Sequence, residues 1–201
     1  MNLQSEVFSW SLSIENMGEK QKIVGLALCG SYCSYDKVFA AAGVLAEKYE
    51  LIPIMSGTAA ATDSRFGMAE ENMRRLTELT GHADVVTTIA AAEPLGPARP
   101  MDALLIALAH GITDSAVTMA AKAHLRNGRP LVLAISTNDG LSGSAENIAR
   151  LLNRKNVYFV PFGQDDPAKK PCSLQADFSL MYASVEAAMA GAQLQPILTA
   201  K

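Results

Sequence analysis

The feature that most constrains this chain is an apolar run that ends in Gly-Ser and leads at once into a helical pattern. Residues 23–29 are apolar, Gly30 and Ser31 follow them, and helical spacing begins at about Tyr35. This order predicts a buried strand, a tight turn and a helix whose N-terminus faces the turn. Free N–H groups and the helix dipole make such a turn a favourable site for an anion, most often a phosphate. The hydroxyls of Ser31 and Ser34 would add hydrogen bonds, although a turn that binds nothing fits the same pattern equally well.

Two common nucleotide-binding motifs are absent from the sequence. No G-x-G-x-x-G occurs, so a dinucleotide fingerprint is not supported, and no G-x-x-x-x-G-K-[ST] occurs, so a P-loop NTPase is not supported either. A phosphate at this turn would therefore depend on backbone and small polar side chains.

The composition suits one α/β domain that is apolar for a monomer. Of 201 residues, 49% are hydrophobic and 18% are charged, and much of the excess is alanine, which suggests close packing of helices and buried interfaces between subunits. The net charge of −3 argues against nucleic acid as a main partner. No apolar run reaches the roughly 18 residues of a membrane span, and the first residues lack the layout of a signal peptide. We therefore expect a cytoplasmic protein without a membrane partner.

Strand and helix patterns alternate along the chain, which predicts an α/β fold with a parallel sheet. Residues 1–20 are expected to form an extension, and residues 21–201 a single domain. The expected strands are 23–29, 51–55, 85–89, 101–107, 131–135 and 157–161. The expected helices are 35–48, 68–80, 115–127, 145–153 and 180–190, with loops at 59–66 and 162–171 and a break in regular structure at 92–97.

The predicted strands all end at one edge of the sheet, and ligands of open α/β sheets bind there. The loops at this edge are 30–34, 56–58, 108–114, 136–140 and 162–171. They carry hydroxyl and amide groups that suit a phosphorylated, polyhydroxylated ligand such as flavin mononucleotide (FMN). Polar groups alone are also typical of solvated connections.

Candidate ligand contacts follow from these loops. Ser136, Asn138 and Gln164 are expected at the substrate. Lys169 and Lys170 would hold a substrate carboxylate, unless they are simply a solvated pair on an exposed loop.

The cysteines and histidines predict no metal site. The three cysteines fit no zinc spacing, and Cys29 in the strand should act as a small hydrophobe. Cys33 is the one candidate for a reactive thiol, although a turn residue without chemistry is the preferred interpretation. Of the three histidines, His82 and His124 are interpreted as surface residues. His110 lies at the ligand edge, where a structural role is preferred to acid–base chemistry.

Several long strings are similar to the family of dipicolinate synthase B subunits. They are TMAAKAHLRN at 118–127, LVLAISTN at 131–138, NVYFVPFGQDDP at 156–167, GSYC at 30–33, TDSRFG at 62–67 and AEPLGP at 92–97. The resemblance extends over residues 22–196. It places the chain in the flavoprotein superfamily of FMN-dependent cysteine decarboxylases, phosphopantothenoylcysteine decarboxylases and flavin prenyltransferases.

The resemblance implies a three-layer Rossmann-like fold with FMN bound between subunits of a trimer-based oligomer. It implies that Gly30, Ser31, Cys33, Ser34 and Ser56 line the flavin phosphate or ribityl chain. Thr113 and Asp114 would lie near the flavin ring, and the loop 162–171 would approach a small dicarboxylate substrate.

The reaction implied by the resemblance converts a dihydrodipicolinate-type intermediate to dipicolinate in the mother cell of a sporulating bacterium. An NAD(P)-dependent A subunit would be the partner of this chain in an oxidoreductase complex. A scaffold subunit without flavin is the main alternative, and a decarboxylase of another carboxylate is a third possibility.

One segment departs from the family pattern. Relatives continue from the strand at 101–107 into a loop resembling Pro-x-Thr-Gly-Asn-Thr, whereas here residue 107 runs directly into LAHGITD at 108–114. Either this chain has lost the loop, or a segment is missing from the sequence; the good match on both sides favours the second interpretation.

Overall fold

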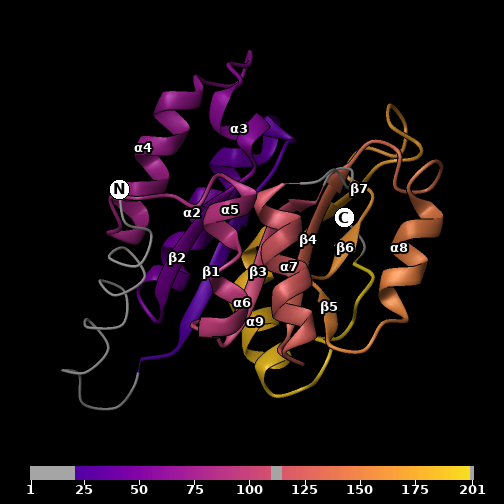
Figure 1. Cartoon of the computed structure of the whole chain (residues 1–201). Helices are drawn as coiled ribbons and strands as arrows, with labels where there is room; N and C mark the ends of the chain where they lie inside the picture. Colours follow the sequence, from indigo (N-terminus) through magenta and orange to yellow (C-terminus); the bar gives the residue numbers. More distant parts are fainter. Residues whose placement is uncertain (1–20, 110–114, 200–201) are drawn as a thin grey trace.

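The computed structural model describes residues 21–109 and 115–199, and it shows the predicted α/β architecture (Figure 1). Among these residues, seven strands form one sheet in the order β2-β1-β3-β4-β7-β6, with β5 paired to β4. The pairs β1–β2, β1–β3, β3–β4 and β4–β5 are parallel, whereas β7 runs antiparallel to both β4 and β6. The prediction of a parallel Rossmann-like core is confirmed, and an antiparallel addition at one side was not expected.

The element bounds agree closely with the stronger sequence patterns. The strands are β1 Ile23–Leu28, β2 Glu50–Met55, β3 Ala103–Ala109, β4 Leu131–Thr137, β5 Val157–Phe159, β6 Phe162–Gly163 and β7 Leu174–Ala176. The α-helices are α2 Tyr35–Ala46, α3 Gly57–Ala61, α4 Ala69–Thr80, α5 Ile89–Ala92, α6 Leu95–Ala98, α7 Ala116–Arg126, α8 Ala145–Leu152 and α9 Met181–Met189. Two 3₁₀ turns, η1 Tyr32–Ser34 and η2 Phe178–Leu180, precede α2 and α9.

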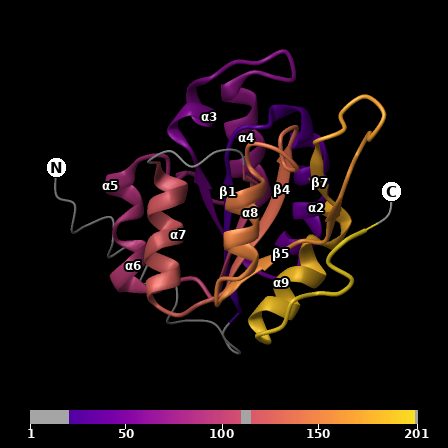
Figure 2. The same cartoon turned by 90° about the vertical axis from the view of Figure 1, so that its right-hand side faces the viewer.

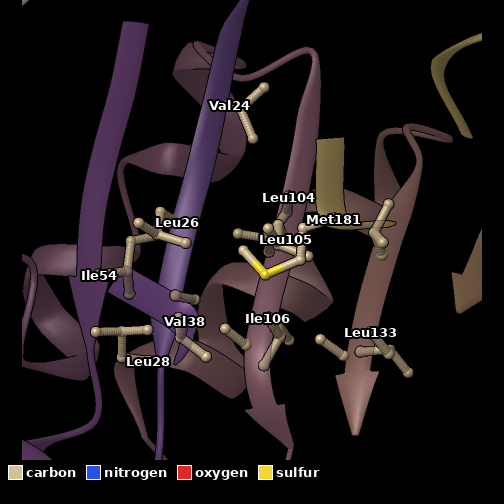
Figure 3. Close-up of a cluster of buried hydrophobic side chains, with 14 of the residues drawn as sticks. Val24, Leu26, Leu28, Val38, Ile54, Leu104, Leu105, Ile106, Leu133 and Met181 are labelled. Atoms are coloured by element: carbon tan, nitrogen blue, oxygen red, sulfur yellow. The ribbon is translucent and has the colours of Figure 1, made fainter. Parts of the chain in front are cut away.

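The inner strands are buried on both faces, as parallel strands between helical layers must be. Helices α5, α6 and α7 cover one face of the sheet, and α2 and α9 cover the other (Figure 2). In the core, Leu26 and Leu28 of β1 lie beside Ile54 of β2 and Val38 of α2, all shielded from solvent (Figure 3). This packing fixes the positions of the strand ends that carry the candidate site.

Both long edges of the sheet are closed by other segments. At β2, Pro53 lacks an N–H group, its carbonyl accepts from the Val86 N–H at 3.0 Å, and the Met55 N–H donates to the Val86 carbonyl at 2.9 Å. At the opposite side, the Phe162 N–H of β6 donates to the Ile197 carbonyl at 2.9 Å. The two outermost strands are thus paired or lack donors where a further strand would attach.

Helix ends follow the expected capping chemistry. Ser115 caps α7 through a reciprocal bond pattern with Thr118, and Gly81 ends α4 with a φ of 71°. Within the described ranges, no helix is both long and apolar enough to cross a lipid bilayer.

Three local predictions were wrong. The expected strand at 85–89 is only a bridge between Val86 and Ile54, followed by α5. The expected loop at 59–66 begins inside α3, and the expected break at 92–97 holds α6, whose Pro97 lies within its first turn, where no intrahelical donor is needed.

His124 is not a surface residue, contrary to the sequence interpretation. It is 3% exposed, and its Nε2 donates to the Pro130 carbonyl at 2.9 Å. Burial lowers the pKa of His124 to about 4, so the imidazole is neutral at physiological pH. His124 therefore joins the end of α7 to the start of β4.

Candidate functional site

The turn after β1 has the geometry that the sequence predicts. Ser31 adopts a left-handed conformation with φ of 73°, and the Ser34 N–H then donates to the Ser31 carbonyl at 3.0 Å. The Tyr35 hydroxyl, at the start of α2, donates to the Cys29 carbonyl at 2.6 Å and supports the turn from below. Burial raises the pKa of Cys29 to about 12, which keeps its thiol neutral and leaves it as a small hydrophobe.

Three serine hydroxyls meet above the sheet, and we call Ser31, Ser34 and Ser136 the serine cluster. Ser31 Oγ donates to Ser136 Oγ at 3.1 Å, and Ser34 Oγ lies 3.0 Å from Ser136 Oγ. Ser34 and Ser136 are 1% and 4% exposed, so these contacts are held inside the protein. Ser136 was expected at the substrate, but the structure places it with two residues expected at the cofactor.

The cluster lies across the carboxyl ends of three strands. Ser31 and Ser34 follow β1, Ser136 belongs to β4, and β3 lies between those strands in the sheet. Cys33 Sγ lies 3.9 Å from both Ser31 Oγ and Ser34 Oγ, and Cys33 itself is exposed. Four residues that the sequence analysis assigned to ligand contacts are therefore neighbours.

The turn has the donors and the room that a phosphate needs. A left-handed residue followed by helical residues directs successive N–H groups toward one concave side, which binds anions. A Cβ added at Gly30 would meet no atom within 4 Å, so space is open beside the backbone there. Together with the hydroxyls of the serine cluster, these groups fit the phosphate of FMN.

Ser56, which was expected at the cofactor, also stabilises the local structure through two hydrogen bonds. Its hydroxyl accepts the Ala59 N–H at 3.2 Å and so caps α3, and its own N–H donates to the Leu28 carbonyl at 2.9 Å. The second bond places Ser56 at the end of β1, beside the turn that holds Gly30. Its hydroxyl hydrogen is still able to donate to a ligand.

The loop after β4 is organised by Asp139. Its carboxylate accepts from the hydroxyls of Thr137 and Ser144, the second at 3.0 Å. Asn138, expected at the substrate, is exposed next to this aspartate. Asn138 directly follows β4 and comes two residues after Ser136 of the serine cluster.

The segment 162–171 is less open than the predicted loop. It begins with β6, and the Gln164 side chain donates to the Pro171 carbonyl at 2.7 Å, which closes the segment on itself. Lys170 Nζ lies 2.9 Å from Asp165, and Lys169 Nζ lies 3.8 Å from Asp166. Both lysines proposed for a substrate carboxylate already face carboxylates of their own loop.

The pKa shifts of Asp165 and Lys170 reflect the hydrogen bonds and the ion pair within this loop. Burial alone would raise the pKa of Asp165, but hydrogen bonds from Ser173 and Lys170 and the charge of Lys170 outweigh it and lower the pKa to about 2. The Asp165 hydrogen bond in turn raises the pKa of Lys170, with smaller contributions from Asp165, Cys33 and Asp166 charges.

Three expected positions, Thr113, Asp114 and His110, lie outside the described residues. Residues 107 and 108 are consecutive in β3, and the register between β3 and β4 shifts between residues 107 and 109, at the point where relatives were expected to carry an additional loop.

Lys37 is a candidate that sequence reasoning missed. It stands on the first turn of α2, three residues after Ser34, and its Nζ donates to Gln175 Oε1 at 3.3 Å. Gln175 pairs with Ser136 in the β4–β7 ladder. Because no strand was predicted at β7, nothing in the sequence connected this lysine with the site.

Across residues 21–109 and 115–199, no three His, Cys, Asp or Glu side chains gather in a way that could hold a metal ion. The site is instead built from hydroxyls, amides and backbone N–H groups.

A search of protein-family models finds no match. A curated relative, the B subunit of dipicolinate synthase from Bacillus subtilis (strain 168), is 44% identical over 189 residues, with 89% of this chain and 94% of the relative covered.

Solved structures agree with the sequence comparison. The crystal structure of the B subunit of dipicolinate synthase from Bacillus halodurans has a TM-score of 0.80 and 40% identity, with 92% of this chain and all of that chain covered. The FMN-dependent cysteine decarboxylase SpaF has a TM-score of 0.60 at 21% identity, over 85% of this chain and 97% of that chain. The second likeness shows that the same fold is used by a flavoprotein.

Proposed function

The chain belongs to the family of dipicolinate synthase B subunits, and from this we propose that it is the B subunit of such an enzyme, working with an NAD(P)-dependent A subunit. The complex would convert a dihydrodipicolinate-type intermediate to dipicolinate in the mother cell of a sporulating bacterium. The observation that carries the proposal is 44% identity spread over nearly the whole length of both proteins.

The substrate becomes aromatic by losing two hydrogen atoms. One leaves as hydride to NAD(P)⁺ on the A subunit, and the other leaves as a proton. In this scheme the present chain supplies binding surfaces next to the dehydrogenase, and its own contribution is to position the small dicarboxylate.

FMN is proposed as the cofactor of this chain, since SpaF, which has the same fold, is named as FMN-dependent. The turn at Gly30 and the serine cluster would hold the phosphate, with Ser56 nearby on the ribityl side. When bound, FMN supplies a ring that can accept and donate electrons. The family resemblance implies a trimer-based homo-oligomer, in which the cofactor would lie between subunits.

Apart from Ser136, which lies in the serine cluster, the proposed substrate contacts are those predicted from the sequence. Asn138 is exposed beyond β4, and Gln164, Lys169 and Lys170 belong to the loop that approaches the turn. The lysines could exchange their aspartate partners for a substrate carboxylate, because surface ion pairs are worth only about 0–1 kcal/mol.

The test is reconstitution of the pair. Purified A subunit, with and without this chain, is supplied with substrate and NAD(P)⁺, and dipicolinate formation is followed. We expect dipicolinate to form efficiently only when both subunits are present. Equal rates without this chain would reject the proposal.

A scaffold without flavin is a second candidate because of the short connection between β3 and α7. A visible absorption spectrum of the full-length chain after incubation with FMN separates the two. Retained flavin absorption after desalting rejects the scaffold, whereas a colourless chain that still activates the A subunit supports it.

A further inference from the structure

A basic groove lies at the end of the sheet opposite to the serine cluster. It has a volume of about 660 Å³ and is lined by Lys122, Leu125, Arg126, Leu151, Arg154, Lys155 and Asn156. We call these seven residues the basic groove. The groove opens where α7 leads into β4 and α8 leads into β5, so it faces the amino ends of those strands (Figure 1).

The four cations of the basic groove differ from most other cations of the described chain. Elsewhere, Arg75 pairs with Asp36, Arg129 with Asp102 and Arg150 with Glu146. Within residues 21–109 and 115–199, no ion pair involves the four groove cations, and no carboxylate lines the groove. Like charges repel one another, so electrostatics alone would not favour a concentration of unpaired positive charge on a chain whose net charge is −3.

The floor of the basic groove is apolar. Leu125 and Leu151 are partly buried and pack against the core, so they present a remaining apolar surface between the cations. Helix α8 has no fully buried residue, and Leu152 at its end is 43% exposed. An apolar centre with a polar rim is the usual anatomy of a protein–protein interface.

We propose that the basic groove docks the A subunit, through a segment of that subunit that carries carboxylates around apolar side chains. This inference rests on the proposed function, because it assigns a surface to the partner named there. The four groove cations would steer an acidic surface toward the groove, and the two leucines would contribute apolar contact area. Nucleic acid is a poorer fit, because an apolar floor contributes nothing to phosphate contacts.

The test compares two charge reversals of equal size. R126E/R154E reverses two groove cations, whereas K48E/R99E reverses two exposed cations that lie outside the groove and have no ion pair in the described residues. The affinity of each full-length variant for purified A subunit is measured by titration calorimetry at low and high salt. Circular dichroism melts of both variants check that each remains folded.

We expect R126E/R154E to weaken binding at least about tenfold and K48E/R99E to change it less than about threefold. R126K/R154K should restore most of the affinity, because docking requires the charge. Added salt should weaken the wild-type complex and leave the R126E/R154E complex little changed.

Each other result has a definite meaning. If the wild-type chain does not bind the A subunit, the proposed function fails and the groove loses its partner. If both double variants bind like the wild type, the partner exists but docks elsewhere. If R126E/R154E alters only the oligomeric state of the chain, or only its retention of duplex DNA, the groove serves a second copy or a nucleic acid and this inference is overturned.

Discussion

The serine cluster and the loop 162–171 were both expected to contact ligands, but the structure builds them differently. The cluster joins neutral hydroxyls from positions 102 and 105 residues apart in the sequence, and two of its three serines are almost completely buried. The loop joins charged residues at most five apart, Lys170 with Asp165 and Lys169 with Asp166, in which the lysines are exposed and the aspartates half-buried. The cluster is therefore held in place by contacts between residues far apart in the sequence, whereas the loop is held by contacts between residues close together in the sequence.

This difference has an energetic consequence. A buried hydroxyl that loses its partner costs about 1–3 kcal/mol, whereas an exposed ion pair is worth only about 0–1 kcal/mol. Substitutions in the cluster should therefore have large effects on cofactor retention and stability, and substitutions in the loop should have small ones.

The largest effect is expected from Ser31→Trp. The indole would fill the space beside Gly30 where the phosphate is proposed to bind, so flavin retention should be lost while the chain stays folded. The measurement is the FMN-to-protein ratio after desalting, together with a thermal melt. Ser142→Trp, on an exposed loop, is the control, and equal flavin content in both variants would place the phosphate elsewhere.

Ser136→Ala should have the next largest effect. It removes the common partner of Ser31 and Ser34, which leaves the buried Ser34 hydroxyl with only the weak 3.9 Å contact to Cys33 Sγ, and we expect a loss of about 1–2 kcal/mol in the free energy of unfolding. Chemical denaturation measures this loss. Ser142→Ala, at an exposed hydroxyl, should change stability by less than about 0.5 kcal/mol, and indistinguishable midpoints would mean that the cluster is not structurally important.

Removing both loop lysines should matter less. Lys169→Ala with Lys170→Ala is expected to lower kcat/KM of the reconstituted complex by about two- to fivefold, because each ammonium already faces an aspartate. Flavin content should stay unchanged. Lys48→Ala serves as the control, and unchanged kinetics in the double variant would remove these lysines from the substrate site.

The smallest effect concerns pH. The pKa of Asp165 is about 2 in the folded chain against an ordinary value of 3.8, so its stabilising contribution is complete above about pH 4 and is lost as pH falls through about 2. Hydrogen exchange of the Ser173 amide, which donates to the Lys170 carbonyl, should speed up beyond its intrinsic pH dependence over this range. Asp165→Asn should remove the additional dependence; if it persists, another group controls the loop.

Much of this fold could be predicted from the sequence because its inner strands are continuous apolar runs. Val24, Leu104 and Leu133 belong to stretches that can only be buried between two helical layers. The short strands β6 and β7 have too few residues for any periodicity, so neither was expected. The burial of His124 could have been predicted, because His124 continues the buried face of α7 that includes Val117, Ala120 and Ala123.

The candidate site was predictable in its parts but not in its assembly. The turn at Ser31 follows from Gly-Ser after an apolar run, and the hydroxyl of Ser136 follows from a polar residue late in a strand. That these groups bond to each other depends on sheet order, with β3 between β1 and β4. The sequence pattern contains no information on that order beyond the general rules for crossovers.

The closed edges of the sheet restrict how copies of this chain can associate. Pro53 offers no N–H group, Val86 occupies the adjoining positions, and on the far side Ile197 is already bonded to Phe162. Along these two described edges, a neighbouring copy would find no row of free donors and acceptors from which to continue the sheet. Assembly into rings or larger shells would therefore use helix surfaces and loops, and the same closure protects a chain this rich in apolar residues from fibre-like stacking.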